Sequence, residues 1–242
     1  MSIPRGTRLL RTSSVAAALL LGASALAAPL GAQATQQQDE EYTRLIRENL
    51  RDPRITTELV DHLPASSTVP TPLKFHGRIV GQPGELTYAR DIQRYFEALA
   101  KASPRAKFWT IGKSEEGRDM FVLAIADEAT IRDLDSYKAK LAALNDPRKT
   151  SAAQAKELIA TAKPIYWLTS GMHSPETGGP ETLQELAYRL IVEETPYVQT
   201  IRNNVITFIT PVIEVDGREK QVDTYYFNKK RPAGSERLPL MY

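Results

Sequence analysis

One histidine and one carboxylate stand three residues apart, where a short apolar segment ends and an amphipathic one begins. Residues 165–168 form an apolar run with aromatic side chains, which is typical of a buried strand. His173 and Glu176 follow in a loop, and residues 183–191 then repeat apolar side chains at helical spacing. Open α/β sheets bind ligands at the carboxyl ends of their strands, so both side chains can converge there on one cation. An imidazole nitrogen and a carboxylate oxygen suit zinc, whose catalytic sites use three protein ligands and a water molecule.

An ordinary structural explanation exists for the same two residues. A histidine three positions before a glutamate often arises by chance. His173 would then be a loop histidine, and Glu176 would be a carboxylate at a helix start, where the helix dipole favours negative charge. The strand–loop–helix context leaves the metal site and the structural explanation evenly matched.

The segment GMHSPETGGPE, at residues 171–181, resembles the zinc-binding loop of the zinc carboxypeptidases related to carboxypeptidase A. In that family a His-x-x-Glu loop supplies the first two zinc ligands, and the resemblance assigns these roles to His173 and Glu176. Many members have an arginine where this chain has Pro175, so one basic group near the site is replaced. The resemblance covers residues 88–217, and its other specific piece is the segment IGKSEEGR.

The resemblance implies a secreted zinc-dependent metallocarboxypeptidase, which hydrolyses the last peptide bond of a substrate with a free C-terminus. In the family, zinc activates water, a glutamate transfers protons and a basic residue stabilises the oxyanion. Arg231 is the candidate for this basic residue, although a solvated basic loop with Lys229 and Lys230 also explains it. Whether the substrate is a protein, a peptide or a cell-wall peptide stays open.

Several residues that the family requires have no counterpart in this sequence. His62 and His76 are expected to be surface histidines, and no histidine follows His173, so the third zinc ligand is missing. No Asn-Arg pair follows the last predicted strand to hold the substrate carboxylate, and no late glutamate can act as general base. We therefore expect the chain to be the N-terminal part of a longer enzyme, with a fold that is incomplete at the C-terminus. The alternative is a non-catalytic exported module that binds a peptide or a partner protein.

Residues 1–34 have the pattern of a secretory signal peptide. Three arginines precede the apolar run of residues 15–26, and small side chains suit cleavage after Ala34 or Ala27. A membrane anchor is the alternative, but the run is shorter than the about 20 residues that span a bilayer. We expect the mature protein in the periplasm or outside the cell.

The charge and the motif content exclude several function classes. Removal of residues 1–34 changes the formal charge from +2 to −1, because this segment holds three arginines and no acidic residue. The basic character therefore gives no support to nucleic-acid binding. The sequence has no cysteine, so the exported domain must be stable without disulfides. It also lacks the G-x-S-x-G, Walker and dinucleotide-binding motifs of serine hydrolases and nucleotide-binding proteins.

The predicted fold class is α/β, with a mixed central β-sheet, helices on both faces and a zinc-carboxypeptidase-like topology. Residues 35–86 are predicted to be an N-terminal extension, whose proline-rich part lies over the domain, and residues 87–242 the first part of the catalytic domain. The expected strands are residues 106–111 and 120–126, which form a hairpin, 165–168 and 205–213. The expected helices are residues 42–50, 88–101, 134–144, 151–162, 180–191 and 197–202.

Three local patterns give more detailed expectations. Thr87 is expected to cap the helix that follows it. Leu158 and Ile159 are expected to pack toward the core from their helix. Residues 214–217, which end in Asp-Gly, are expected to form a turn that leaves the last strand.

Overall fold

The computed structural model describes residues 36–239. The predicted signal peptide lies outside the described residues, so it stays a prediction. Within residues 36–239, no helix combines the length and the apolar character that a bilayer crossing requires.

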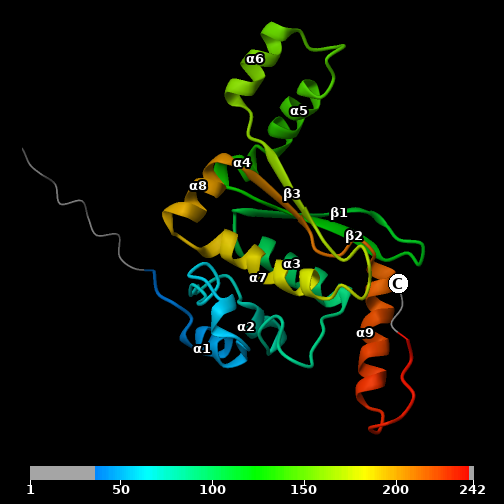
Figure 1. Cartoon of the computed structure of the whole chain (residues 1–242). Coiled ribbons are helices and arrows are strands. Elements are labelled where there is room, and N and C mark those ends of the chain that lie inside the picture. Colours follow the sequence, from blue (N-terminus) through cyan, green and yellow to red (C-terminus); the bar gives the residue numbers. More distant parts are fainter. Residues whose placement is uncertain (1–35, 240–242) are drawn as a thin grey trace, which may run out of the picture. The chain divides into compact units, whose positions relative to one another are not determined.

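A four-stranded mixed sheet lies at the centre of the described chain (Figure 1). Its strands are β1 (Ala106–Lys113), β2 (Asp119–Ile125), β3 (Ile165–Thr169) and β4 (Ile206–Thr210), in the spatial order β1-β2-β4-β3. The predicted hairpin is confirmed, since β1 and β2 pair antiparallel, and β2 also pairs antiparallel with β4. β3 and β4 are parallel, so their carboxyl ends lie at the same edge of the sheet.

The helices are α1 (Glu40–Asn49), α2 (Pro72–His76), α3 (Ala89–Ala102), α4 (Glu128–Arg132), α5 (Leu134–Leu144), α6 (Ala152–Thr161), α7 (Gly178–Val192), α8 (Pro196–Asn204) and α9 (Val215–Lys229), with a short 3-10 turn at Pro53–Ile55. All of the predicted helices are present. The sequence did not predict α2, α4 and α9.

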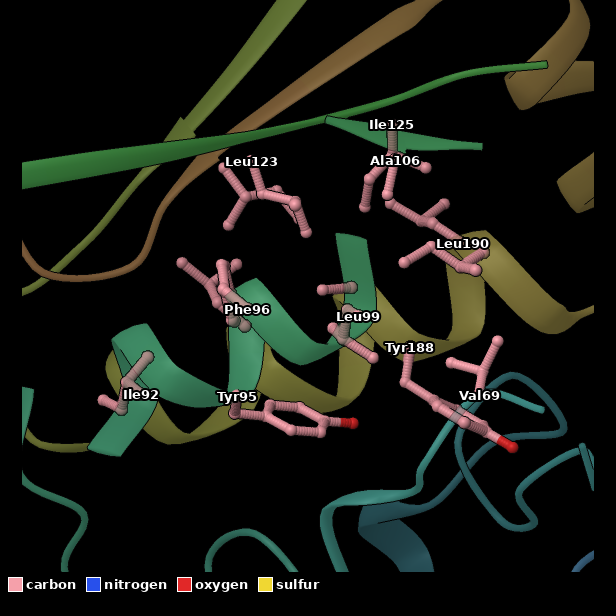
Figure 2. Close-up of a cluster of buried hydrophobic side chains, with 14 of the residues drawn as sticks. Val69, Ile92, Tyr95, Phe96, Leu99, Ala106, Leu123, Ile125, Tyr188 and Leu190 are labelled. Atoms are coloured by element: carbon pink, nitrogen blue, oxygen red, sulfur yellow. The ribbon is translucent and has the colours of Figure 1, made fainter. Parts of the chain in front are cut away.

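The larger apolar core lies between one face of the sheet and the helices α3 and α7 (Figure 2). Alternation along β2 explains this arrangement, because Leu123 and Ile125 point into this core while Val122 and Ala124 point to the opposite face. On that opposite face, Ile131 of α4 and Leu134 at the start of α5 cover the sheet. The prediction of a mixed α/β sheet with helices on both faces is therefore confirmed.

The N-terminal extension shares the core of the predicted catalytic part. Tyr42, Leu63, Val69 and Ile79 are all buried in the same apolar cluster as α3 and α7. The Tyr188 hydroxyl of α7 also donates a hydrogen bond to the Pro64 carbonyl at 2.8 Å. Residues 36–86 are therefore packed onto α7 through apolar contacts as well as hydrogen bonds.

The expectation that Leu158 and Ile159 pack inward is wrong. Ser151 does cap α6, through a capping box with Gln154, but no side chain of this helix is buried. Ile159 is 66% exposed and Leu158 is half-buried. The reason is that α6 packs against α5, so that these two helices form a hairpin at one end of the sheet (Figure 1).

Two local expectations at helix starts are also wrong. The helix α3 begins after Tyr88, and the Thr87 side chain caps no helix because it binds Glu181 instead. Residues 214–217 do not form a turn out of the sheet, since α9 begins at Val215. The Glu214 carboxylate accepts a hydrogen bond from the Gly217 amide at 2.6 Å. This N-cap places Asp216 and Gly217 in the first turn of α9.

Replacing Leu99 by Ala tests the position of the core. Leu99 on α3 is 0% exposed, so its truncation should lower the free energy of unfolding by about 2–5 kcal/mol through lost apolar contacts and a residual cavity. Ile159→Ala on α6 is the matched control, and it should change the free energy of unfolding by less than about 0.5 kcal/mol. Urea unfolding of both variants measures the difference. Equal effects at the two sites would contradict this packing.

Candidate metal site

The loop of residues 170–177, which we call the metal loop, connects the carboxyl end of β3 to the start of α7. Its first residues are bonded to the segment that follows β4. The Ile213 amide donates to the Ser170 carbonyl at 2.9 Å, and the Glu214 amide donates to the Gly171 carbonyl at 3.0 Å. The parallel pairing of β3 and β4 therefore continues beyond the strands and fixes the start of the metal loop.

Glycines allow the metal loop to approach its neighbours closely. Gly171 has a left-handed φ of 62°, and a Cβ there would lie 3.2 Å from both Pro180 Cγ and Val212 Cα. A Cβ on Gly217, in the first turn of α9, would collide with the Ser174 hydroxyl and the Glu214 carboxylate. The metal loop thus lies directly against the backbone at the start of α9.

His173 and Glu176 come together in this loop. His173 Nδ1 lies 3.2 Å from Glu176 Oε1, and the side chains are 59% and 67% exposed. An imidazole nitrogen and a carboxylate oxygen on one fixed loop, both open to solvent, fit two positions of a zinc site. Throughout residues 36–239, this loop included, no set of three or more histidine and acidic side chains is arranged to hold a metal ion.

Arg231 is not brought to this pair. It follows the last residue of α9, and its guanidinium lies 5.5 Å from the ring centre of Phe227. The metal loop packs against the opposite end of α9, and a helix of 15 residues is about 22 Å long. Figure 1 shows α9 running away from the sheet, so its far end carries Arg231 away from the metal loop.

The two other histidines also lie outside the metal loop. His62 Nδ1 is 2.6 Å from Asp61 Oδ1, and His76 Nε2 is 2.9 Å from Gln184 Oε1. Both histidines are half-buried, so each lies at the surface with only part of its ring exposed. The ring of His76 packs against the neighbouring Phe75 and against Tyr95 of α3. Burial lowers the pKa of His76, although its hydrogen bond to Gln184 acts in the opposite direction.

The hairpin segment IGKSEEGR contacts the start of α9. The Arg118 guanidinium and the Ser114 hydroxyl donate to Asp216 Oδ1 at 2.6 and 2.8 Å, and the Glu116 amide donates to Asp216 Oδ2 at 3.0 Å. Burial raises the pKa of Asp216, but these hydrogen bonds outweigh it and leave the pKa below its usual value. Arg118 therefore holds the tip of the hairpin on the start of α9.

A buried polar junction lies next to the metal loop, and it was missed by sequence reasoning. Glu181 in the first turn of α7 is surrounded by Thr87, Gln184 and Arg218. A glutamate in the first helical turn ordinarily faces the solvent and the helix dipole, so its position in the sequence gave no sign of burial. Burial lowers the pKa of the Arg218 guanidinium, while the negative charge of Glu181 raises it.

The zinc carboxypeptidase family model matches residues 92–237, more than half of the 242-residue chain. The chain belongs to the zinc carboxypeptidase family. This confirms the resemblance found in the sequence, and the matched residues include the metal loop and the hairpin of β1 and β2. A search of curated proteins gave no match to this zinc carboxypeptidase chain.

Solved carboxypeptidase structures match parts of the chain. A carboxypeptidase A from Helicoverpa armigera is 24% identical, with 56% of this chain and 26% of that chain covered and a TM-score of 0.38. A metallo-carboxypeptidase from Burkholderia cenocepacia is 18% identical, with 54% and 28% covered and a TM-score of 0.37. Bovine thrombin-activatable fibrinolysis inhibitor, in complex with tick carboxypeptidase inhibitor, is 16% identical, with 57% and 34% covered and a TM-score of 0.37. The matched part thus spans about a quarter to a third of the length of these solved carboxypeptidases.

Replacing Gly217 by Ala tests the close contact between α9 and the metal loop. Alanine should favour the helix by about 1 kcal/mol. The collision with Ser174 and Glu214 should outweigh this gain, because overpacking costs about 1–3 kcal/mol and the displaced Glu214 loses its cap. Thermal unfolding should therefore show a lower midpoint for Gly217→Ala. Gly112→Ala in β1, where a Cβ meets no atom within 4 Å, should not lower it, and a stabilised Gly217→Ala would refute the contact.

The lowered pKa of His76 predicts a pH dependence of stability. Below its ordinary pKa of 6.5, the unfolded state binds a proton that the buried ring in the folded state does not bind. The free energy of unfolding should therefore fall as the pH decreases from about 7.5 to about 5.5, and His76→Gln should lose less stability over this range. Urea unfolding at both pH values measures this difference. Parallel losses in wild type and variant would show that His76 titrates alike in the two states.

Proposed function

We propose that this chain supplies the first two zinc ligands, His173 and Glu176, of a secreted metallocarboxypeptidase. The observation that carries the proposal is the 3.2 Å approach of His173 Nδ1 to Glu176 Oε1 on the loop between β3 and α7. Both side chains are open to solvent, so an ion can reach them. The membership in the zinc carboxypeptidase family supports zinc as that ion.

The residues of this chain have a holding and orienting role in the proposed site. When bound, zinc supplies Lewis acidity for hydrolysis of a peptide bond. His173 donates a neutral imidazole nitrogen and Glu176 a carboxylate oxygen, while Gly171 and Gly217 let the loop that carries them pack tightly. Because catalytic zinc needs three protein ligands, a third must come from outside residues 36–239. The sequence has only three histidines, and His62 and His76 lie elsewhere, so we infer that a third histidine ligand and the general base belong to a longer form of the enzyme.

The proposed substrate is a peptide with a free C-terminus, and the proposed location is the periplasm or the cell exterior. The family membership supports the peptide, and the signal-peptide pattern of residues 1–34 supports export. A second candidate is a non-catalytic exported module that binds a peptide. The absence of a third metal-binding side chain near His173 within the described residues favours it over catalysis by this chain alone.

Zinc titration of the purified chain tests the metal site. Wild type should bind one zinc ion weakly and lose it readily to a chelator, because two protein ligands give little affinity. His173→Ala and Glu176→Ala should each weaken binding by at least about tenfold, measured by competition with a chromophoric chelator. His62→Ala removes a histidine that also lies beside a carboxylate, and it should leave the affinity unchanged.

Zinc bound with wild-type affinity and stoichiometry by His173→Ala or Glu176→Ala would overturn the assignment. If His62→Ala lowers the association constant for zinc as much as His173→Ala does, the histidines bind the ion non-specifically. Catalysis is tested separately by mass spectrometry of a peptide incubated with the protein from its native source. Removal of C-terminal residues that a chelator abolishes supports the enzyme, and an intact peptide supports the binding module.

A further inference from the structure

We propose that the buried ion pair between Glu181 and Arg218 is a positioning element, which fixes the metal loop between the starts of α7 and α9. The part of the proposal that concerns zinc affinity rests on the function proposed above. The position of the metal loop itself can be measured without any metal.

Glu181 is held by partners from two other elements. Its Oε1 accepts from the Thr87 amide and from Arg218 Nη2, both at 2.6 Å, and its Oε2 accepts from the Thr87 hydroxyl at 2.7 Å. Arg78 Nη1 lies 3.9 Å from Oε2 and donates from Nη2 to the Thr87 hydroxyl at 2.7 Å. The carboxylate therefore has partners on both oxygens, in a site where its side chain is only 5% exposed.

Arg218 makes few contacts for a buried guanidinium. Its side chain is 1% exposed, and its Nε donates to the Thr87 carbonyl at 2.9 Å in addition to the bond from Nη2 to Glu181. Its Nη1 is buried and has no hydrogen-bond partner within the part of the chain that the structure describes. The position of this side chain thus depends on Glu181 and Thr87, since the third nitrogen is not held.

The two members of the pair belong to the two helix starts that enclose the metal loop. Glu181 lies in the first turn of α7, which begins two residues after Glu176. Arg218 directly follows Gly217, whose backbone contacts Ser174 in the metal loop. The pair therefore connects the start of α7, where the metal loop ends, to the start of α9, on which the middle of the loop packs. A change in the distance between the two helix starts would move His173 and Glu176 relative to each other.

A second buried arginine, paired with a glutamate that is 39% exposed, provides a control at the opposite edge of the sheet. Arg202 of α8 is 4% exposed, and its Nη2 donates to Glu194 at 2.7 Å. Arg202 precedes β4, whereas the metal loop lies beyond the carboxyl ends of β3 and β4. Loss of this pair should destabilise the protein in a similar way without reaching the metal loop.

The experiment compares Arg218→Met, Glu181→Gln and Arg218→Lys with Arg202→Met, at a temperature where all four variants are folded. The first readout is hydrogen exchange of peptides that cover residues 171–177, in protein without metal. Arg218→Met and Glu181→Gln should increase exchange there by at least about tenfold, while Arg202→Met should leave it within about twofold of wild type. Arg218→Lys keeps the charge, so it should restore part of the protection and remains informative if Arg218→Met does not fold.

The second readout is the zinc dissociation constant by chelator competition. Arg218→Met should raise it by about 10–100-fold and Arg202→Met should not, as expected when a residue that orients a ligand is lost. Exchange in residues 171–177 that is unchanged in Arg218→Met, or that rises equally in Arg202→Met, would overturn the positioning role. If the wild type binds no zinc but Arg218→Met still exchanges faster in residues 171–177, the positioning role stands. That result would overturn only the proposed metal site.

Discussion

The parallel pairing of β3 with β4 is the constraint on which the rest of the structure depends. It brings two chain segments to one edge of the sheet, and the backbone bonds from Ile213 and Glu214 to Ser170 and Gly171 continue that pairing into the loops. The starts of α7 and α9 follow these segments directly, so both helices begin at the same edge. The exposed pair of His173 and Glu176 can be held by a short loop because the backbone beneath it is fixed on both sides.

The electrostatics near this edge combine exposed and buried charges with different roles. His173 and Glu176 are exposed, which leaves their lone pairs available to an ion. Glu181 and Arg218 are buried, and a buried charge is costly unless it is paired and hydrogen-bonded. Thr87 satisfies this condition by offering its amide and hydroxyl to Glu181 and its carbonyl to Arg218. The N-terminal extension takes part as well, since Arg78 and His76 approach the same junction through Thr87 and Gln184.

Sequence periodicity predicted most of the elements, because α3 buries one regular set of apolar positions and β2 is apolar on both faces. The His-x-x-Glu spacing also predicted that His173 and Glu176 lie together, since they are close in the chain, while their role as metal ligands stays a prediction. Sequence reasoning failed where contacts are distant in sequence. Thr87 looked like a helix cap but binds Glu181, 94 residues away in the chain. The Asp-Gly pair at 216–217 was wrongly predicted for another reason, since it is a common turn sequence but here follows Glu214, which caps a helix. Burial of His76 depends on Tyr95 and Gln184, which no local pattern could reveal.

The strand order has a consequence for how the chain folds as it is synthesised. Among the strands of residues 36–239, β4 is the last in chain order, yet it lies between β2 and β3. The hairpin of β1 and β2 can form early from local contacts, but the partner that β3 has among the described strands, β4, leaves the ribosome only later. The nascent chain therefore carries an unpaired, aromatic β3 strand through the synthesis of α7 and α8, a period in which it is open to association with other chains. Insertion of β4 joins β3 to the hairpin and gives the metal loop its shape in the same step.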